Sequence, residues 1–448
     1  MLKLNVVANP TSQRIPKVFT CLTLALFSIH AVAKWDGYKL KTNVSVAAKA
    51  STALNYPDLP KYLEDKIAGK KMKTAPSAVA KVDSSLSQDW ALMNIGFFDV
   101  FSPLVQPVKP NVQSCSPEVV VAVIDTGVDY THKELMESVW VNPGESGAWE
   151  PPQALKAKIS CRDKGCNGVD DDGNGFVDDV VGWDFVHNIP LPYDTHGHGT
   201  HIAGIISAAA ANGVGTTGVC PRVAIMSLKY YDNSGAGYNN LNNTVRAIHY
   251  AVQNGAQIIN YSGGGADPAP AERIAIESAQ RRGILFVAAS GNDGHNNDQT
   301  PYFPQNYPID NIIGVASVNR QSTLLPSSNF GKTVDIAAPG LGILSTLPEG
   351  RLGTMSGTSQ ATAFVTGAAA LLASQLKVAG LPFDYKAIKK WILEGAKPMK
   401  GNERKVLVSS GLLNIAQALQ VQREDLKKPV LTTPEVALTP LKNSSTPQ

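Results

Sequence analysis

Short apolar runs alternate along the chain with longer alanine-rich segments, and the two patterns predict different elements. Residues 119–124 and 223–228 are β-branched or apolar almost without interruption, which is typical of strands buried on both faces of a parallel sheet. Residues 202–210 and 360–372 are apolar and alanine-rich over the length of a buried helix. The pattern therefore favours an α/β protein with a mostly parallel central sheet.

Three side chains with complementary chemistry stand at the ends of these elements. Asp125 follows the first apolar run, at the edge of a parallel sheet where ligands bind, His198 precedes one predicted helix, and Ser359 opens another. A serine hydroxyl becomes a nucleophile when a histidine takes its proton and a carboxylate orients that histidine. The chain order Asp, His, Ser is also the order of the subtilisin triad.

Each motif also has an ordinary interpretation. Asp-Thr-Gly is usually a turn, and Gly-Thr-Ser is usually a helix cap. The spacing of His196, His198 and His201 could indicate zinc, but no cysteine or glutamate ligands flank it. Because the three motifs agree in residue type, order and placement, we favour a catalytic triad.

The motifs resemble those of subtilisin-like serine proteases, the subtilases, over residues 89–419. The resemblance implies a three-layer α/β fold, with helices on both faces of a mostly parallel sheet. It also implies a serine endopeptidase that cleaves protein or peptide substrates through an acyl-enzyme. By this match Asp125 orients the base, His198 is the general base, Ser359 is the nucleophile, and Asn292 is a side-chain donor of the oxyanion hole.

Two further segments resemble the walls of the family's first substrate pocket. The match assigns substrate contacts to Ser262, Gly263, Gly264, Ala289, Ser290 and Gly291. Gly263 stands where the family often has leucine, so we expect the pocket to lack an apolar wall there. Gln360 and Ala363 also depart from the family's serine helix.

These departures leave an alternative function, an exported binding protein that retains the scaffold with impaired catalysis. The intact catalytic positions favour the protease. A third class, an esterase or lipase, would show Gly-x-Ser-x-Gly and the order Ser, Asp, His, and the chain shows neither.

An acidic segment between Asp125 and His198 predicts a structural calcium site. Asp170, Asp172, Asn174 and Asp178 place hard oxygen ligands at near-alternate positions of a tight turn. Val181 stands where an EF-hand loop has its glutamate, so the segment is no complete EF-hand. The alternative is a solvated acidic turn.

A second calcium site is implied by the resemblance alone. Residues 212–216 resemble the family's calcium-binding loop after the histidine helix. The match assigns Asn212 to this site, together with Glu134 in the place of the usual aspartate.

The two ends of the chain differ from its middle. Lys3, Arg14 and Lys17 precede an apolar run that ends before Ala-Val-Ala33, which predicts a signal peptide over residues 1–33 and a secreted protein. We expect a short propeptide or extension over 34–82, the peptidase domain over 83–420 and a disordered tail over 421–448. No later run is apolar and long enough to suggest a membrane span, and we expect a monomer.

Composition adds limits on partners and compartment. The 448 residues have a net charge of +3, which is too small to argue for nucleic acid or acidic partners. With Cys21 in the signal peptide, four cysteines remain for an oxidising compartment. Three pairings of the four are possible, as are four free thiols. The adjacent strands of the family's fold favour Cys115–Cys220 together with Cys161–Cys166.

Overall fold

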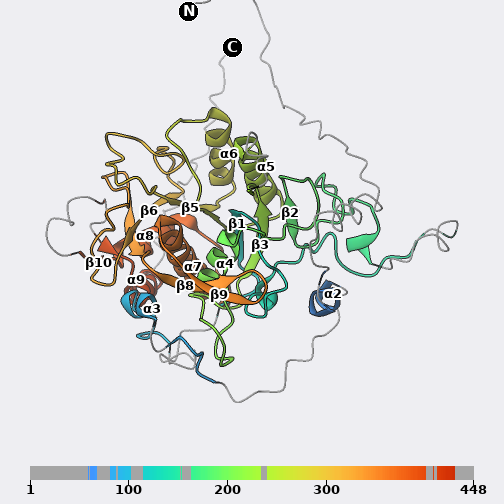
Figure 1. Ribbon diagram of the computed structural model, residues 1–448, viewed down its shortest axis with the longest axis horizontal. Coiled ribbons are helices and arrows are strands. Elements are labelled where there is room, and N and C mark those ends of the chain that lie inside the picture. Colours follow the sequence, from blue (N-terminus) through green and yellow to red (C-terminus); the bar gives the residue numbers. More distant parts are fainter. Residues whose placement is uncertain are drawn as a thin grey trace, which may run out of the picture. The chain divides into compact units, whose positions relative to one another are not determined.

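A sheet of buried, mostly parallel strands forms the centre of the computed structural model (Figure 1). The structure describes residues 59, 61–67, 81–86, 89–101, 115–151, 153, 163–233, 240–399, 407 and 411–428. The strand order is β10-β11-β7-β6-β5-β4-β1-β3-β2, and all neighbours are parallel except β10 and β11. The strands are β1 (Val120–Asp125), β2 (Gly182–Asp184), β3 (Ala224–Lys229), β4 (Ile258–Tyr261), β5 (Leu285–Ala289), β6 (Ile312–Val318), β7 (Ile336–Pro339), β10 (Lys397–Pro398) and β11 (Gly411–Leu412).

Helices cover both faces of this sheet and make the fold three-layered (Figure 1). One face carries α4 (His198–Ser207) and α7 (Thr358–Val378), and the other carries α5 (Asn240–Gln253) and α6 (Pro270–Arg281). The other described elements are α2 (Lys61–Ile67), α3 (Trp90–Asn94), α8 (Tyr385–Glu394), α9 (Ile415–Leu426), the short 3₁₀ turns η2 (Met136–Ser138) and η4 (Lys164–Cys166), and a hairpin of β8 (Ile343–Leu347) and β9 (Arg351–Met355). The predicted α/β class with a mostly parallel sheet is confirmed.

The continuous apolar pattern of β1 has a direct structural cause. Val121 and Val123 pack into the core on the α4 and α7 side, whereas Ala122 and Ile124 pack on the α5 and α6 side. Successive side chains of a strand point to opposite faces, and both faces of this sheet are covered. An apolar residue is therefore required at every position of the strand.

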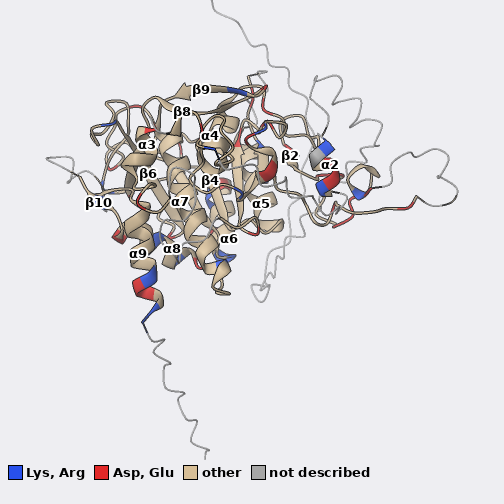
Figure 2. Cartoon of the chain, turned by 90° about the horizontal axis from the view of Figure 1, so that it is seen from below, with Lys and Arg blue, Asp and Glu red and all other residues tan. Residues whose placement is uncertain are grey.

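Helix α7 is the central helix of the core. It carries no acidic residue in its 21 positions and is drawn almost entirely in the colour of uncharged residues (Figure 2). Among the described helices it alone is apolar and long enough to cross a membrane, but 83% of its apolar window is buried inside the protein. We therefore interpret it as a core helix that holds Ser359 in place.

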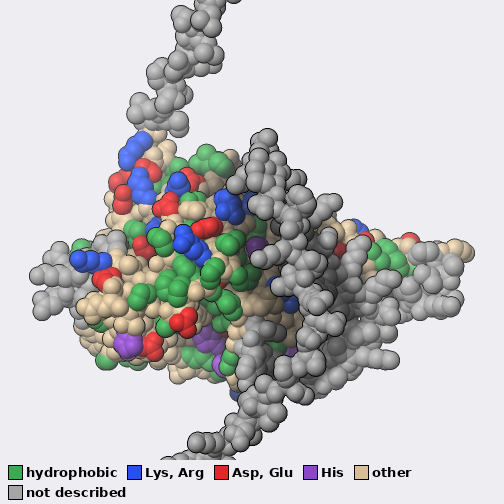
Figure 3. All heavy atoms as spheres, turned by 90° about the horizontal axis from the view of Figure 1, so that it is seen from above, with side chains coloured by type: hydrophobic (Ala, Val, Ile, Leu, Met, Phe, Trp, Pro, Cys, Tyr) green, Lys and Arg blue, Asp and Glu red, His purple; other side chains and the backbone are tan. Residues whose placement is uncertain are grey.

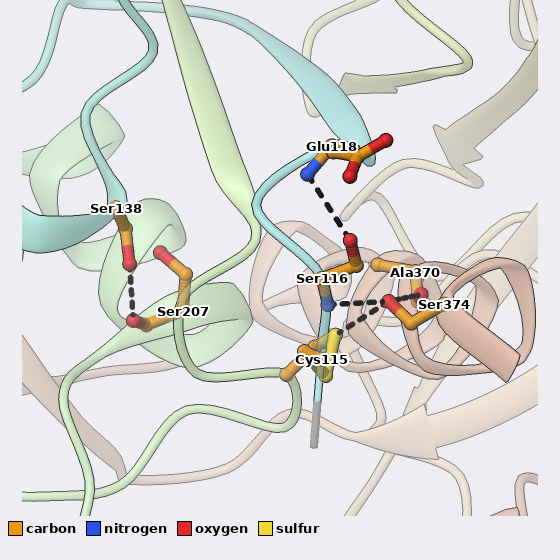
Figure 4. Close-up of a disulfide and its surroundings, with 8 residues drawn as sticks. Cys115, Ser116, Glu118, Ser138, Ser207, Ala370 and Ser374 are labelled. Carbon is orange, nitrogen blue, oxygen red and sulfur yellow. Dashed lines mark hydrogen bonds between the residues drawn. A yellow bond between two sulfur atoms is a disulfide. The ribbon is translucent and has the colours of Figure 1, made fainter. Parts of the chain in front are cut away.

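The Cys115–Cys220 disulfide fastens the start of β1 to the start of β3 (Figure 4). Ser374 of α7 lies beside it, where its hydroxyl accepts a hydrogen bond from the Ser116 amide at 3.0 Å. The favoured pairing of Cys115 with Cys220 is confirmed. Cys166 also takes part in a disulfide, and Cys161, its expected partner, lies outside the described residues.

The predicted domain end at position 420 is wrong, because α9 continues to Leu426. Gln422 in this extra part is buried and donates to the Leu372 carbonyl at 3.0 Å. The Trp391 indole donates to Asp425 at 2.9 Å. These contacts attach residues 421–426 to the core, and residues 429–448 of the expected tail lie outside the described residues.

Part of the expected N-terminal extension packs on the peptidase domain. Leu63 and Ile67 of α2 are buried in a small apolar cluster with Tyr130 and Val139. Lys66 donates to the Val139 carbonyl at 2.7 Å. Removal of residues 34–82 as a propeptide stays a prediction, and residues 1–33 lie outside the described residues.

Charged side chains of both signs are interspersed on the face drawn in Figure 3. Apolar side chains lie between them on the same face. This distribution matches the small net charge of the whole chain.

Candidate active site

Asp125 lies at the carboxyl end of β1, an inner strand of the sheet between β4 and β3. Its side chain is buried, and its Oδ1 atom accepts hydrogen bonds from His198 Nδ1 at 2.7 Å and from the Thr126 amide at 2.8 Å. This contact assigns the proton of the imidazole to Nδ1. The second ring nitrogen, Nε2, is then the one that can accept a proton.

His198 is the first residue of α4, and a second buried carboxylate shapes the turn that leads to it. Asp194 Oδ1 accepts from the amides of His196 and Gly197, both at 2.8 Å, and Oδ2 accepts from the Thr200 amide at 2.9 Å. Asp194 also accepts from the Thr126 hydroxyl next to Asp125. One side chain therefore connects the two segments that carry Asp125 and His198.

Sequence reasoning did not single out Asp194, although a signal was present. An acidic residue shortly before a predicted helix is a common acceptor for the free amides of the first helical turn. Asp194 has this position relative to α4.

The environment of His198 acts on its pKa in two directions. Burial lowers the pKa, but the negative charge of Asp125 and the hydrogen bond to it raise the pKa by more, with a smaller contribution from Asp194. The net effect is a pKa above the ordinary value of 6.5. Asp125 therefore stabilises the imidazolium form of His198.

Ser359 is the second residue of α7, and its side chain is almost fully buried. Its hydroxyl donates to the Ser262 carbonyl at 3.4 Å and makes no hydrogen bond to His198 among the described contacts. Long or absent triad hydrogen bonds are common in proteases without substrate. The Ser359 amide lies in the first turn of the helix, where N–H groups lack helical acceptors.

Asn292 follows β5 and contacts the start of α7. Its Oδ1 atom accepts from the Thr358 amide at 2.9 Å and from the Thr358 hydroxyl at 3.2 Å. Because an amide oxygen accepts hydrogen bonds and an amide NH₂ group only donates them, these contacts assign the oxygen of the Asn292 side chain to the end that faces Thr358. Its exposed Nδ2 makes no hydrogen bond among the described residues and can donate to a ligand beside Ser359.

The predicted substrate-contact residues lie on two neighbouring segments. Ser262, Gly263 and Gly264 follow β4, whereas Ser290 and Gly291 follow Ala289 at the end of β5. Because β4 and β5 are parallel and paired, with Tyr261 opposite Ala288, the two segments leave the sheet side by side. The Ser290 side chain is buried and donates to the Asn329 carbonyl.

The expectation that Gly263 leaves the pocket without an apolar wall stays a prediction, and the structure shows which side chains lie beside this glycine. A Cβ atom placed on Gly263 would collide with the hydroxyl of Tyr230 and would lie 2.9 Å from the hydroxyl of Tyr261. The hydroxyl groups of two tyrosines therefore lie beside Gly263, in place of an apolar side chain at this position.

The acidic segment forms a group that differs from the predicted one. Ligand atoms of Asp170 and Asp172 lie within 4.8 Å of each other and of a carboxylate oxygen of Glu145, which sequence reasoning missed. Glu145 is fully buried, and its Oε2 atom has no hydrogen-bond partner. Burial, with the nearby charges of Asp179 and Asp172, raises the pKa of Glu145 to about 8. These features suit a divalent cation, which would neutralise the carboxylates.

The other two predicted ligands do not join this group. The Asp178 carboxylate accepts from the Gly168 amide at 3.1 Å and closes a neighbouring turn. Asn174 turns its amide nitrogen toward the acids and donates to Asp179 at 2.9 Å. The spacing of residues within the loop could not predict Glu145, because this residue approaches the loop from a separate segment.

Glu134 and Asn212, the residues of the second expected site, are brought together. Asn212 Nδ2 donates to Glu134 Oε1 at 3.1 Å, and the buried Oε2 atom of Glu134 has no partner. Burial raises the pKa of Glu134 to about 7. An amide nitrogen does not ligate calcium, so the pair is a hydrogen bond in this structure and the second calcium site stays a prediction.

The three histidines near α4 do not form a metal group. His201 is buried on the core side of the helix, where its Nε2 atom lies 3.0 Å from the Ile343 carbonyl and 3.2 Å from the Gly353 carbonyl. Both contacts require a proton on Nε2. His201 is thereby engaged in packing, and the described residues give no histidine group suited to a metal.

Comparison with known proteins assigns the class. Residues 116–414 match the model of the subtilase family (Peptidase S8), and the chain belongs to this family. It is a subtilisin-like serine protease, a hydrolase whose substrates are proteins or peptides.

Two curated relatives show how far the likeness extends. The chain is 39% identical to thermitase of Thermoactinomyces vulgaris over 228 residues, which cover 51% of this chain and 78% of that protein. It is 36% identical to a thermophilic serine proteinase of Bacillus sp. (strain AK1), over 57% of this chain and 52% of that protein. The matched part is therefore about half of the second relative.

A solved structure shows the same fold. The prenylagaramide maturation protease PagA has a TM-score of 0.51 and 26% identity to this chain. The likeness covers 69% of this chain and 94% of that protein.

We predict that Asp125→Asn lowers the pKa of His198, because the substitution removes the charge that raises it. The acid titration of the imidazole should then move to lower pH. NMR titration of His198 in a Ser359→Ala background, which prevents autolysis, measures this shift. An unchanged or higher pKa would show that Asp125 does not stabilise the imidazolium.

Proposed function

We propose that this subtilase is an exported serine endopeptidase that uses Asp125, His198 and Ser359 as its catalytic triad. The main support is the 2.7 Å hydrogen bond between Asp125 and His198, which lies at the same sheet edge as Ser359. In this assignment the Ser359 hydroxyl attacks the scissile carbonyl and His198 Nε2 takes its proton. Asp125 holds the imidazole and stabilises its charged form.

The second half of the reaction uses the same groups. His198 gives its proton to the leaving amine, and the C–N bond breaks to leave an acyl group on Ser359. Water, deprotonated by His198, then attacks the ester and releases the carboxyl product. His198 and Ser359 return to their starting states.

We assign the oxyanion hole to Asn292 Nδ2 and the Ser359 amide. The Thr358 contacts hold Asn292 so that its NH₂ group is free to donate. The negative charge on the carbonyl oxygen appears only in the tetrahedral transition state, so a fixed donor accelerates the reaction.

The substrate backbone is expected to lie along residues 261–265 as an added strand. Residues 262–264 carry no strand assignment, because the chain leaves the sheet after Tyr261. Their backbone groups can therefore pair with an extended peptide. A peptide bound in this way would have a carbonyl next to Ser359, whose hydroxyl contacts the Ser262 carbonyl at 3.4 Å.

We propose that a structural calcium ion is held by Asp170, Asp172 and Glu145. The buried, unpartnered oxygen of Glu145 supports this site more strongly than the acidic sequence does. Bound calcium would offset carboxylate repulsion and stabilise the loop, and it would take no part in peptide hydrolysis.

Export is proposed from the basic and apolar N-terminal segment with its Ala-Val-Ala33 motif. The Cys115–Cys220 disulfide is compatible with an oxidising compartment. The protein would act as a monomer outside the cytoplasm.

Ser359→Ala should abolish hydrolysis of peptide substrates by several orders of magnitude while the fold is retained. A fluorophosphonate probe should label the wild-type protein and leave this variant unlabelled. Circular dichroism checks that both proteins are folded. Absence of labelling in folded wild-type protein would instead favour the binding-protein alternative.

Asn292→Ala should lower kcat by about 100- to 1000-fold with little change in KM, because the oxyanion exists only in the transition state. Steady-state kinetics with a chromogenic peptide measures both constants. Asn242→Ala, on the exposed surface of α5, is the matched control. A change confined to KM would assign Asn292 to ground-state binding.

Removal of calcium should lower the melting temperature, because an ion that binds only the folded form adds about 2.7 kcal/mol at 100 times its Kd. The fall should be reversed by calcium and not by equimolar magnesium. Glu145→Gln and Asp172→Ala should both weaken the response to chelator, whereas the exposed Asp267→Asn should not. A melting curve that a chelator leaves unchanged would exclude the site.

A further inference from the structure

The aromatic ring of Tyr302 lies between the two backbone segments that flank Ser359. A Cβ atom placed on Gly264 would lie 2.5 Å from Tyr302 Cε1, and one on Gly291 would lie 3.0 Å from Tyr302 Cδ2. These carbons are opposite corners of the ring. The ring therefore spans the gap between the segment after β4 and the segment after β5.

The glycines at these two positions make room for the ring. Any larger residue at Gly264 would also collide with the Phe303 carbonyl, and one at Gly291 with the Asn329 side chain. A close approach of this kind is a common reason for glycine in a loop. The backbone is therefore shaped around Tyr302 on both sides.

Backbone hydrogen bonds hold Tyr302 in this place. The next residue, Phe303, pairs with Gly265 through two bonds, from Gly265 N to Phe303 O at 2.9 Å and from Phe303 N to Gly265 O at 2.8 Å. The Tyr302 amide donates to Asn306 Oδ1 at 3.0 Å. The ring is thus anchored beside the segment that would bind the substrate backbone.

Tyrosines also fill the neighbouring side of this space. The hydroxyl of Tyr230 occupies the volume next to Gly263, and its ring lies 5.5 Å from that of Tyr261, centroid to centroid. The side chains of Tyr230, Tyr261 and Tyr302 thus lie against the glycines that follow Ser262. A large apolar side chain would have to displace one of them.

We infer that Tyr302 restricts the first substrate pocket, so that the enzyme prefers a small residue such as glycine, alanine or serine at the scissile carbonyl. The inference rests on the proposed function, because it takes Ser359 as the nucleophile and residues 262–264 as the peptide-binding segment. The two segments resemble the walls of the family's first substrate pocket, so the side chain of the residue whose carbonyl lies at Ser359 would fall between them. Tyr302 occupies the space that a large side chain would need.

Peptide p-nitroanilides that differ only in the residue before the anilide, alanine or phenylalanine, test this inference. Wild-type enzyme should cleave the alanine substrate with a kcat/KM about 100-fold higher, the scale at which pockets discriminate by size. Tyr302→Ala removes the ring and should reduce this ratio by about tenfold or more, chiefly by raising kcat/KM for phenylalanine.

Tyr302→Phe is the matched control, because it keeps the ring and removes only the hydroxyl. Its ratio should stay within about threefold of wild type if ring volume causes the preference. Active-site titration with a fluorophosphonate corrects every rate for the fraction of folded, reactive enzyme, and the wild-type ratio tests the inference even where Tyr302→Ala does not fold.

Two results would overturn the inference: equal or better cleavage of the phenylalanine substrate by wild type, or an unchanged ratio in folded Tyr302→Ala. Failure of the proposed function gives a different result. In that case folded wild-type protein neither reacts with the fluorophosphonate nor cleaves either substrate.

Discussion

The parallel register of β1, β4 and β5 is the constraint on which the whole site depends. β1 pairs with β4, and β4 pairs with β5, so the segments that carry Asp125, Ser262 and Asn292 leave the sheet at one edge. Helix α7 is buried along most of its length against β4, β5 and β6, and it brings Ser359 to the same edge. A shift in any of these strands would move one reactive group relative to the others, and the buried side chains on both sheet faces oppose such a shift.

The placement of the three residues that we propose as the triad could be predicted, because each stands in a contiguous motif at the end of a strongly patterned element. The buried strand before Asp125 and the alanine-rich helices after His198 and Ser359 are local signals, and the structure forms all three elements. The disulfide followed from the same fold, because the strands after Cys115 and Cys220 are neighbours. The end of the domain was predicted too early because the contacts that define it are not local in the sequence. The polar sequence of α9 concealed that Asp425 binds Trp391 and Lys390, contacts that lower the pKa of Asp425 to about 2.

The residues that sequence reasoning missed act through contacts that no local spacing encodes. Glu145 contacts the acidic loop from a separate segment, where its carboxylate accepts a hydrogen bond from the amide of Asp171, 26 positions further along the chain. The loop motif therefore indicated an oxygen-rich group, in which the structure brings Asp170 and Asp172 together with Glu145, whereas Asp178 and Asn174 make other contacts. Asp194 likewise connects Thr126 to the turn before α4, across 68 positions. In both cases a buried carboxylate has to find partners, and only the folded chain shows which partners these are.

Gly263 shows why a single substitution is a poor guide to the shape of a pocket. Taken alone, glycine in the place of leucine predicts a missing apolar wall. The structure adds that the hydroxyl of Tyr230, the residue after β3, lies where a Cβ atom on Gly263 would be. Gly264 and Gly291 are similar, because the ring of Tyr302 lies in the space beside each of them. Because protein interiors are close-packed, the space beside a glycine is commonly filled by a side chain from another position. Three glycines around a binding segment can therefore mean a narrow pocket rather than an open one, and the aromatic residues that fill it determine which substrates it accepts.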